Sequence, residues 1–172
     1  GALLVYFSTD FVFDGRLDRP YTEEDAPNPL SIYGASKLAG EMHALACPDH
    51  LVIRTAWLFG NGRENFITKI IARARSGAKI TVVDDQHGSP THTTDLAGGA
   101  MALVEKSARG VFHLTNRGSC SRFEFAQVIV EKAGIRAEVS PAKTVPAPGI
   151  AARPEHGVLS MKKYESLTGL PL

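Results

Sequence analysis

Residues 31–46, SIYGASKLAGEMHALA, lie between two short apolar runs and predict the helix of a βαβ unit. Ser31 can cap the first turn of this helix. Apolar side chains recur along it at helical spacing, at Ile32, Ala35, Leu38, Ala39, Met42 and Ala46. The flanking runs, residues 3–7 and 51–53, are continuously apolar, as in strands buried in a parallel sheet. We therefore expect an α/β fold in which the helix connects two parallel strands.

Tyr33 and Lys37 are four residues apart, so on this helix they lie on one face, one turn from each other. An ammonium close to a phenol favours the ionised form of the phenol, which makes it a better proton relay near neutral pH. The motif is short, however, and Lys37 with Glu41 is also an ordinary surface ion pair. The pair alone is compatible with acid–base chemistry and with a half-buried aromatic beside a salt bridge.

Composition limits the classes of function. The chain has 172 residues, of which 44% are hydrophobic and 22% are charged, values typical of a globular protein. A net charge of +1 provides no basic surface for nucleic acid, and no apolar run approaches the length of a membrane span. We therefore expect no nucleic-acid or membrane partner. Two cysteines do not make a disulfide framework, so we expect a cytoplasmic protein. The six histidines show no metal-site spacing, and we expect no metal.

Candidate ligand-binding residues follow each predicted strand at the point where the strand ends. Ser8, Thr9 and Asp10 come after the first strand, and Ala56 and Trp57 come after the second. The carboxyl ends of parallel strands meet at one edge of a sheet, where open α/β sheets bind their ligands. The sequence therefore predicts one crevice bounded by these residues and the predicted helix.

Five motifs of the chain match one enzyme family. They are STDFVFDG at 8–15, YGASKLAGE at 33–41, RTAWLFG at 54–60, VDDQHGSPT at 83–91 and TDLA at 94–97. Together they resemble the extended short-chain dehydrogenases/reductases, most closely the dTDP-4-dehydrorhamnose reductase family. The resemblance implies NAD(P)H-dependent reduction of the C4 keto group of dTDP-4-dehydro-L-rhamnose to dTDP-L-rhamnose, a step of dTDP-rhamnose biosynthesis.

The resemblance also implies roles for residues at matching positions. Tyr33 would protonate the carbonyl oxygen of the sugar as hydride arrives, Lys37 would hold the nicotinamide ribose, and Thr9 would hydrogen-bond the same oxygen. The cofactor, NADPH or NADH, is expected to contact Ser8, Tyr33, Lys37 and Ala56. The dTDP-sugar substrate is expected to contact Thr9, Asp10, Trp57, Gln86 and Arg153, with the arginine at the diphosphate.

The glycine-rich strand–turn–helix that takes the cofactor pyrophosphate in this family has no match in the chain. The chain is therefore expected to be the C-terminal part of a reductase and not to bind NADPH tightly alone. We expect residues 1–62 to be the remaining part of a Rossmann-like domain that carries the catalytic residues. Residues 63–172 are expected to combine a small α+β substrate-binding region with the last strand and helix of that domain.

Further elements are expected beyond Trp57. They are helices over 64–76, 94–106, 121–132 and 160–168, with caps at Thr94-Asp95 and Ser121, and strands over 79–83 and 111–114. The proline-rich run 141–154 is expected to be a long loop. Glu155-His156-Gly157 departs from the Asn or Ser residues that the family pattern places after Arg153-Pro154, which leaves the nucleotide contact open.

Two other functions are compatible with the same fold. One is a related sugar-nucleotide epimerase or dehydratase, and the other is a non-catalytic regulatory protein. Dehydratases of this kind usually carry an Asp-Glu pair after the threonine, whereas Asp10-Phe11 follows Thr9 here. The presence of Thr9, Tyr33 and Lys37 together argues against a regulatory role. The choice between NADH and NADPH stays open, and a homodimer is one expected assembly.

Overall fold

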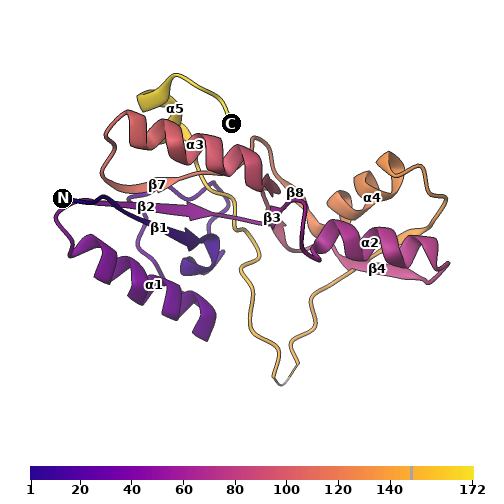
Figure 1. Ribbon diagram of the computed structural model, residues 1–172. Helices are drawn as coiled ribbons and strands as arrows, with labels where there is room; N and C mark the ends of the chain where they lie inside the picture. Colours follow the sequence, from indigo (N-terminus) through magenta and orange to yellow (C-terminus); the bar gives the residue numbers. More distant parts are fainter. Residues whose placement is uncertain (148) are drawn as a thin grey trace.

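A parallel sheet of three strands forms the first layer of the protein (Figure 1). The computed structural model describes residues 1–147 and 149–172. The strand order is β1-β2-β7, with the bounds Leu4–Thr9, His50–Thr55 and Gly110–His113. Both neighbouring pairs are parallel. The expected α/β architecture with a parallel sheet is therefore confirmed.

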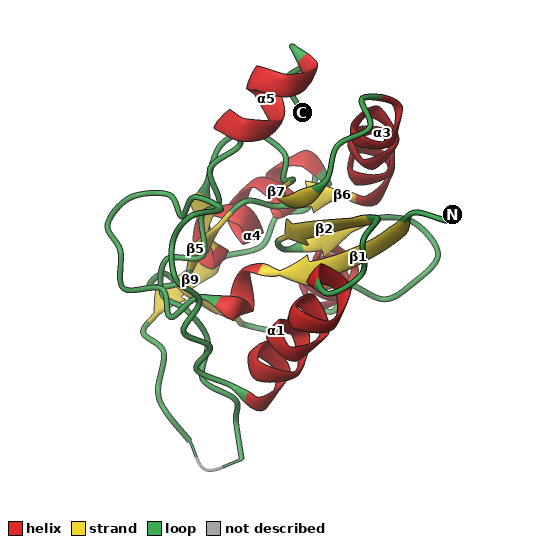
Figure 2. Ribbon diagram, turned by 90° about the vertical axis from the view of Figure 1, so that its left-hand side faces the viewer, coloured by secondary structure: helices red, strands yellow, loops and turns green. Residues whose placement is uncertain are grey.

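Helices cover both faces of this sheet (Figure 2). On one face lies α1, Ile32–Leu45, which connects β1 to β2 and packs on both strands. On the other face lie α3, Thr93–Glu105, and α5, Lys162–Thr168. The core beneath α3 and α5 contains Leu51, Ile53, Leu96, Leu103, Phe112, Leu114 and Tyr164. The predicted βαβ unit is thus present, and its helix carries Tyr33 and Lys37.

A second core lies beside the sheet, to the right in Figure 1. It is built from α2, Phe66–Arg75, α4, Arg122–Lys132, and the parallel pair β4, Ile80–Val83, and β9, Val139–Ala142. Two short strand pairs complete the fold: β3, Leu58–Phe59, with β6, Thr91–His92, and β5, His87–Gly88, with β8, Cys120–Ser121. Since α3 and β7 return to the first sheet, the two cores alternate along the sequence.

The helix caps follow the sequence, with one exception. The Ser31 hydroxyl accepts a hydrogen bond from the Gly34 amide, and Ser121 forms a capping box with Glu124. The predicted cap of α3 at Thr94-Asp95 is wrong, because His92 caps this helix through its ring nitrogen. The chain enters α3 directly from β6, and this leaves no room for a separate capping residue.

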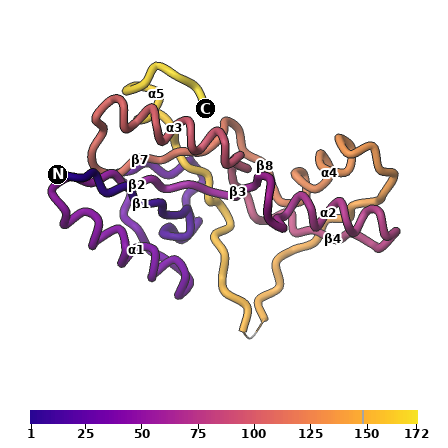
Figure 3. The backbone as a smooth tube through the Cα atoms, in the orientation of Figure 1, coloured from indigo at the N-terminus to yellow at the C-terminus, as the bar shows by residue number. Residues whose placement is uncertain are grey.

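The proline-rich run forms a loop only after residue 142. Pro141 lies in β9, a strand that the sequence analysis missed. This strand pairs only with β4 among the described residues, and proline is tolerated in such an edge strand. The loop that follows projects away from both cores, as the tube in Figure 3 shows. Pro148, part of the predicted loop, lies outside the described residues.

The apolar face predicted for α1 is wrong. Ile32 is 90% exposed and Met42 is 67% exposed, whereas the buried positions of the helix are Gly34, Glu41 and Ala44. Gly34 faces the segment that follows β1, and the helix passes so close to the backbone of Phe11 that a side chain at residue 34 would collide with it. Close backbone approach and a buried ion pair, rather than apolar side chains, therefore set the rotation of α1 about its axis.

Glu41 and Arg54 form that ion pair, which ties α1 to β2. Arg54 Nε lies 2.9 Å from Glu41 Oε1, and Nη2 lies 2.7 Å from Oε2, so the contact is bidentate. The two side chains are only 5% and 1% exposed. Arg54 also stacks over Phe13 at 5.0 Å. The alternative interpretation, a surface ion pair of Glu41 with Lys37, is therefore wrong, because the Glu41 carboxylate binds Arg54 of β2.

β1 is less buried than its apolar sequence predicts. Leu4 and Phe7 are 41% and 43% exposed. Among the described residues β1 lies at the edge of the sheet and pairs with no strand other than β2. An edge strand has one covered side and one open side, which explains the exposure of side chains that a central strand would bury.

Candidate active site

Thr9 ends β1 and caps the short 3-10 helix η1, Asp10–Val12. Its hydroxyl donates to Asp10 Oδ1 at 2.9 Å and accepts a bond from the Phe11 amide at 3.2 Å. Thr9 and Asp10 are 6% and 3% exposed. The hydroxyl of Thr9 is thus fixed at the carboxyl edge of the sheet, where sequence analysis placed it.

Asp10 is a buried carboxyl with an altered acidity. Burial raises its pKa from the ordinary value of 3.8 to about 6, although the bond from Thr9 and the positive charge of Arg122 act in the opposite direction. Gly157 covers this carboxyl, since a Cβ at residue 157 would lie 2.7 Å from Asp10 Oδ2. The glycine that departs from the family pattern therefore allows the C-terminal segment to seal the site.

Asp10→Asn is expected to stabilise the folded protein at high pH. The native carboxyl keeps its proton up to about pH 6, whereas the unfolded carboxyl releases it near 3.8, so wild-type stability falls as pH rises between these values. Two pKa units correspond to roughly 3 kcal/mol at most. Urea unfolding should show a gain in the free energy of unfolding of the variant at pH 8 and little gain at pH 4. An equal gain at both values would refute the assigned ionisation.

Tyr33 and Lys37 reach the same end of β1 from α1. The Tyr33 ring is 52% exposed and meets Phe11 edge-to-face at 5.6 Å. Phe11 in turn donates its amide to Thr9. Lys37 Nζ donates to the carbonyl of Phe7, two residues before Thr9, and lies 4.2 Å from the centre of the Tyr6 ring. Tyr33 and Lys37 thus each contact a residue two positions from Thr9, at the carboxyl end of β1.

Trp57 follows β2 and has a strained backbone. Its φ is +46°, a conformation that costs a residue other than glycine of order 1–3 kcal/mol and is typical of functional sites. Gly88 makes room for the indole, because a Cβ at residue 88 would lie 2.5 Å from it. The guanidinium of Arg122 lies over the same indole, 3.5 Å from the ring centre. The structure thus holds Trp57 in one orientation.

Ser8 and Ala56, the remaining predicted cofactor contacts, are buried at the ends of β1 and β2. Within the part of the chain that the structure describes, the Ser8 hydroxyl has no hydrogen-bond partner. A buried and unsatisfied hydroxyl is costly, and a bound ligand is one usual explanation. This observation fits a cofactor contact at the end of β1.

Gln86 and Arg153 line a cavity of about 750 Å³. Its walls come from α2, β4 and residues 144–147 and 150–155, and include Phe66, Val82, Asp85, Gln86, Arg122, Ile150 and Arg153. Gln86 Nε2 donates to Thr144 at 2.9 Å, and Asp85 accepts two further bonds from Thr144, each 2.7 Å long. Gln86 and Asp85 therefore anchor Thr144, one residue of the cavity wall. Arg153 also lines a neighbouring cavity of about 540 Å³ with Asp14, Arg16 and Glu155.

The chain matches the family model described as RmlD substrate binding domain over residues 1–172. It belongs to this family. The dTDP-4-dehydrorhamnose reductase of Mycobacterium tuberculosis strain H37Rv is 39% identical over 99% of the chain and 58% of its own length. The spore coat polysaccharide biosynthesis protein SpsK of Bacillus subtilis is 39% identical over 96% of the chain and 58% of its own length. The chain thus spans about three-fifths of the curated relatives that it matches.

Solved structures agree with this assignment to the RmlD family. The dTDP-4-dehydrorhamnose reductase of Bacillus anthracis in complex with NADP superposes with a TM-score of 0.93 at 39% identity, covering 99% of the chain and 61% of that structure. A UDP-galactose 4-epimerase superposes with a TM-score of 0.78 at 23% identity, which shows the shared fold alone. The expected family is confirmed.

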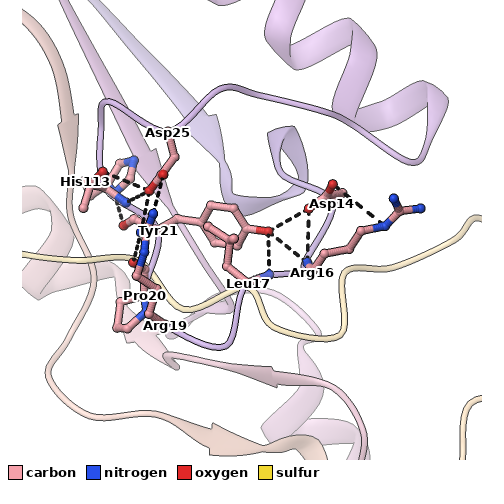
Figure 4. Close-up of polar contacts among 9 residues, drawn as sticks. Asp14, Arg16, Leu17, Arg19, Pro20, Tyr21, Asp25 and His113 are labelled. Carbon is pink, nitrogen blue, oxygen red and sulfur yellow. Dashed lines mark hydrogen bonds and ion pairs between the residues drawn. The ribbon is translucent and has the colours of Figure 1, made fainter.

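The loop before α1 contains a network of hydrogen bonds and ion pairs that the sequence analysis did not predict (Figure 4). The Tyr21 hydroxyl donates to Asp14 at 2.7 Å and accepts from the Arg16 amide at 2.9 Å. This bond holds the pKa of Asp14 below its ordinary value. Arg19 and Asp25 form a bidentate ion pair, and the Tyr21 carbonyl lies 3.1 Å from His113 Nδ1. The network fixes the loop that delivers the chain to the Tyr33 helix.

Arg122 is the site residue that sequence analysis missed. A basic residue at the first position of a helix carries no distinctive signal, and its partners Trp57 and Asp10 are distant in sequence. Among the described residues, no three His, Cys, Asp or Glu side chains group as a metal site, and no helix has the length and apolar content needed to cross a membrane.

Proposed function

We propose that the protein carrying this chain reduces the C4 ketone of dTDP-4-dehydro-L-rhamnose to dTDP-L-rhamnose with NADPH or NADH. The observation that supports the proposal most strongly is the grouping of Thr9, Tyr33 and Lys37 around the end of β1. A cavity of about 750 Å³, large enough for a sugar nucleotide, is lined by Arg122 and Arg153, and Arg122 stacks on Trp57. The relatives named dTDP-4-dehydrorhamnose reductase give the reaction its substrate.

The residues present fit the nicotinamide end of the cofactor. Ser8 offers a buried hydroxyl without a partner among the described residues, and Lys37 of α1 places its ammonium at the carbonyl of Phe7, the residue before Ser8. With Tyr33 and Ala56, these residues would hold the nicotinamide and its ribose. When bound, the cofactor supplies the hydride. NADP in the Bacillus anthracis structure favours NADPH over NADH for the proposed reaction.

Other residues of the chain would bind the sugar and supply the proton. Thr9 donates a hydrogen bond to the C4 oxygen once its hydroxyl turns from Asp10, and Tyr33 holds the proton that this oxygen takes. Donors fixed in advance around a developing oxyanion are the main electrostatic contribution to such catalysis. Asp10 and Trp57 line the hexose, while Gln86 and Arg153 bind the nucleotide side. Burial of Thr9 and Asp10 keeps water from the reacting carbonyl.

The organisation of the protein is part of the proposal. Residues 1–62 contribute the catalytic side chains, and 63–172 contribute the cavity for the nucleotide together with α3 and β7 of the first sheet. A cytoplasmic location and a homodimer stay predictions. The exposed apolar side chains Ile32 and Met42 on α1 support the homodimer.

The experiment uses the product of the complete coding region and follows oxidation of NADPH on addition of dTDP-4-dehydro-L-rhamnose. We expect oxidation that depends on the sugar and yields dTDP-L-rhamnose. UDP-galactose and dTDP-glucose in place of the substrate test the epimerase and dehydratase alternatives, and neither should be converted. Conversion of either sugar without net oxidation of NADPH would contradict the proposal, and the absence of any reaction would favour a regulatory protein.

A further inference from the structure

We propose that Arg122 is a second arginine for the diphosphate of the sugar nucleotide, acting together with Arg153. The proposal rests on the proposed function, since it assigns a residue to the recognition of that substrate. Nothing in the sequence motifs assigns a role to Arg122. Its surroundings in the structure do so.

The guanidinium of Arg122 is held at the junction of the hexose site and the large cavity. It lies 3.5 Å from the centre of the Trp57 ring and 5.3 Å from that of Phe66, and it lines the cavity. At the backbone, the Arg122 amide donates to the Gln86 carbonyl at 3.0 Å. Stacking on an aromatic face leaves the edges of a planar guanidinium open for hydrogen bonds. The side chain is therefore oriented in advance for an acceptor.

The polar groups of Arg122 lack the partners that a structural arginine has. Its Nε is buried without a hydrogen-bond acceptor in the described part of the chain. The buried Arg54, by contrast, binds Glu41 through three hydrogen bonds, although its Nη1 also has no partner among the described residues. Within the described residues no ion pair joins Arg122 or Arg153 to a carboxylate, whereas seven other such pairs are present. An anionic ligand would satisfy both arginines.

The charges around the cavity favour an anion that contacts both arginines. Burial and, after it, the charge of Arg153 lower the pKa of Arg122 to about 10, so the two cations repel each other. The Asp10 carboxylate acts in the opposite direction but lies on the hexose side. A diphosphate presents two groups of oxygens and accepts bidentate bonds from guanidinium groups. A diphosphate bound between Arg122 and Arg153 would offset the repulsion between them and accept hydrogen bonds from their guanidinium groups.

The competing interpretation is that Arg122 only covers Trp57. A covering role needs the planar cation and the stack but no ligand, so its loss would affect every ligand of the site to the same extent. A diphosphate role affects only ligands that carry the phosphates. Thymidine and dTDP differ in this respect alone, which makes them the matched pair of probes.

The test is titration of wild-type and variant protein with dTDP and with thymidine by calorimetry. Fluorescence of Trp57, the single tryptophan of the chain, gives a second readout at the site itself. Arg122→Gln is expected to weaken dTDP binding by about tenfold or more, the size of a lost charge-assisted hydrogen bond, and to change thymidine binding less than about twofold. Arg122→Lys keeps the charge and should recover part of the dTDP affinity. Lys132→Gln removes a charge from the exposed far end of α4 and should change neither.

The outcomes separate this inference from the proposed function. If wild-type protein binds dTDP and Arg122→Gln binds it equally well, the inference is wrong and the reductase proposal stands. Equal weakening of dTDP and thymidine would assign Arg122 to the covering role and also overturn the inference. Failure of wild-type protein to bind dTDP at all would contradict the proposed substrate, and the inference with it.

Discussion

Tyr33→Phe is expected to lower kcat for reduction of dTDP-4-dehydro-L-rhamnose by about 10²–10⁴-fold, the usual contribution of a positioned general acid. The variant removes one oxygen and keeps the ring that meets Phe11 at 5.6 Å. The hydroxyl belongs to a side chain that is 52% exposed, so its loss should leave folding almost unchanged. Steady-state kinetics of wild-type and variant protein at saturating NADPH measure the effect.

Two controls test whether the loss of kcat comes from unfolding or from weaker nucleotide binding. The thermal unfolding midpoint of Tyr33→Phe should match that of wild-type protein, and the affinity for dTDP should change less than about twofold, because the phenol lies outside the nucleotide cavity. A variant with wild-type kcat would remove Tyr33 from the mechanism. The role of proton donor would then have to pass to another residue of the site.

The largest effect on stability is expected at Glu41. Removing one partner of a buried ion pair leaves a buried charge uncompensated, and Glu41→Ala should lower the free energy of unfolding by about 3–5 kcal/mol. Urea denaturation measures the loss. Arg54 would remain enclosed beside Phe13, 5.0 Å away, without its carboxylate. Since Glu41 and Lys37 belong to the same helix, kcat should fall together with stability.

An exposed ion pair of the same chain is the matched control for Glu41→Ala. Lys69 and Glu64 are 3.1 Å apart but 61% and 73% exposed, so Glu64→Ala should cost less than about 1 kcal/mol. The double variant Glu41→Leu with Arg54→Met replaces the buried pair by apolar side chains and should recover most of the stability. If Glu41→Ala lowers the free energy of unfolding no more than Glu64→Ala does, water reaches the ion pair of Glu41 and Arg54.

The sequence predicted the elements well where local chemistry decides them. The apolar runs that became β1 and β2 and the helix caps at Ser31 and Ser121 are all read from neighbouring residues. The position of Thr9 at the carboxyl edge follows from the βαβ order. These features depend on short-range patterns, which explains their success.

The rotation of α1 could not be predicted from periodicity. Hydrophobic spacing assigned Ile32 and Met42 to the covered face, yet Gly34 and Glu41 lie there. Only the position of Arg54 on the neighbouring strand explains why a carboxylate is buried at this point. The same limit applies to Arg122, whose stacking partner Trp57 is 65 residues away in the sequence. Contacts between distant segments carry no local signal.

Several unfavourable features are concentrated at the candidate site. Asp10 is buried, Trp57 has a positive φ, and Ser8 has no hydrogen-bond partner among the described residues. Each lowers stability locally, and folded proteins retain such features chiefly where function requires them. The gain in stability expected for Asp10→Asn is the counterpart of this cost.

The central claim is that hydride reaches C4 of the sugar while Tyr33 supplies the proton. It is tested most directly by incubating the product of the complete coding region with dTDP-4-dehydro-L-rhamnose and NADPH deuterated at the transferred position. We expect dTDP-L-rhamnose that carries deuterium at C4, formed far more slowly by Tyr33→Phe. A product without deuterium at C4, or one formed at the same rate by the variant, would contradict the account.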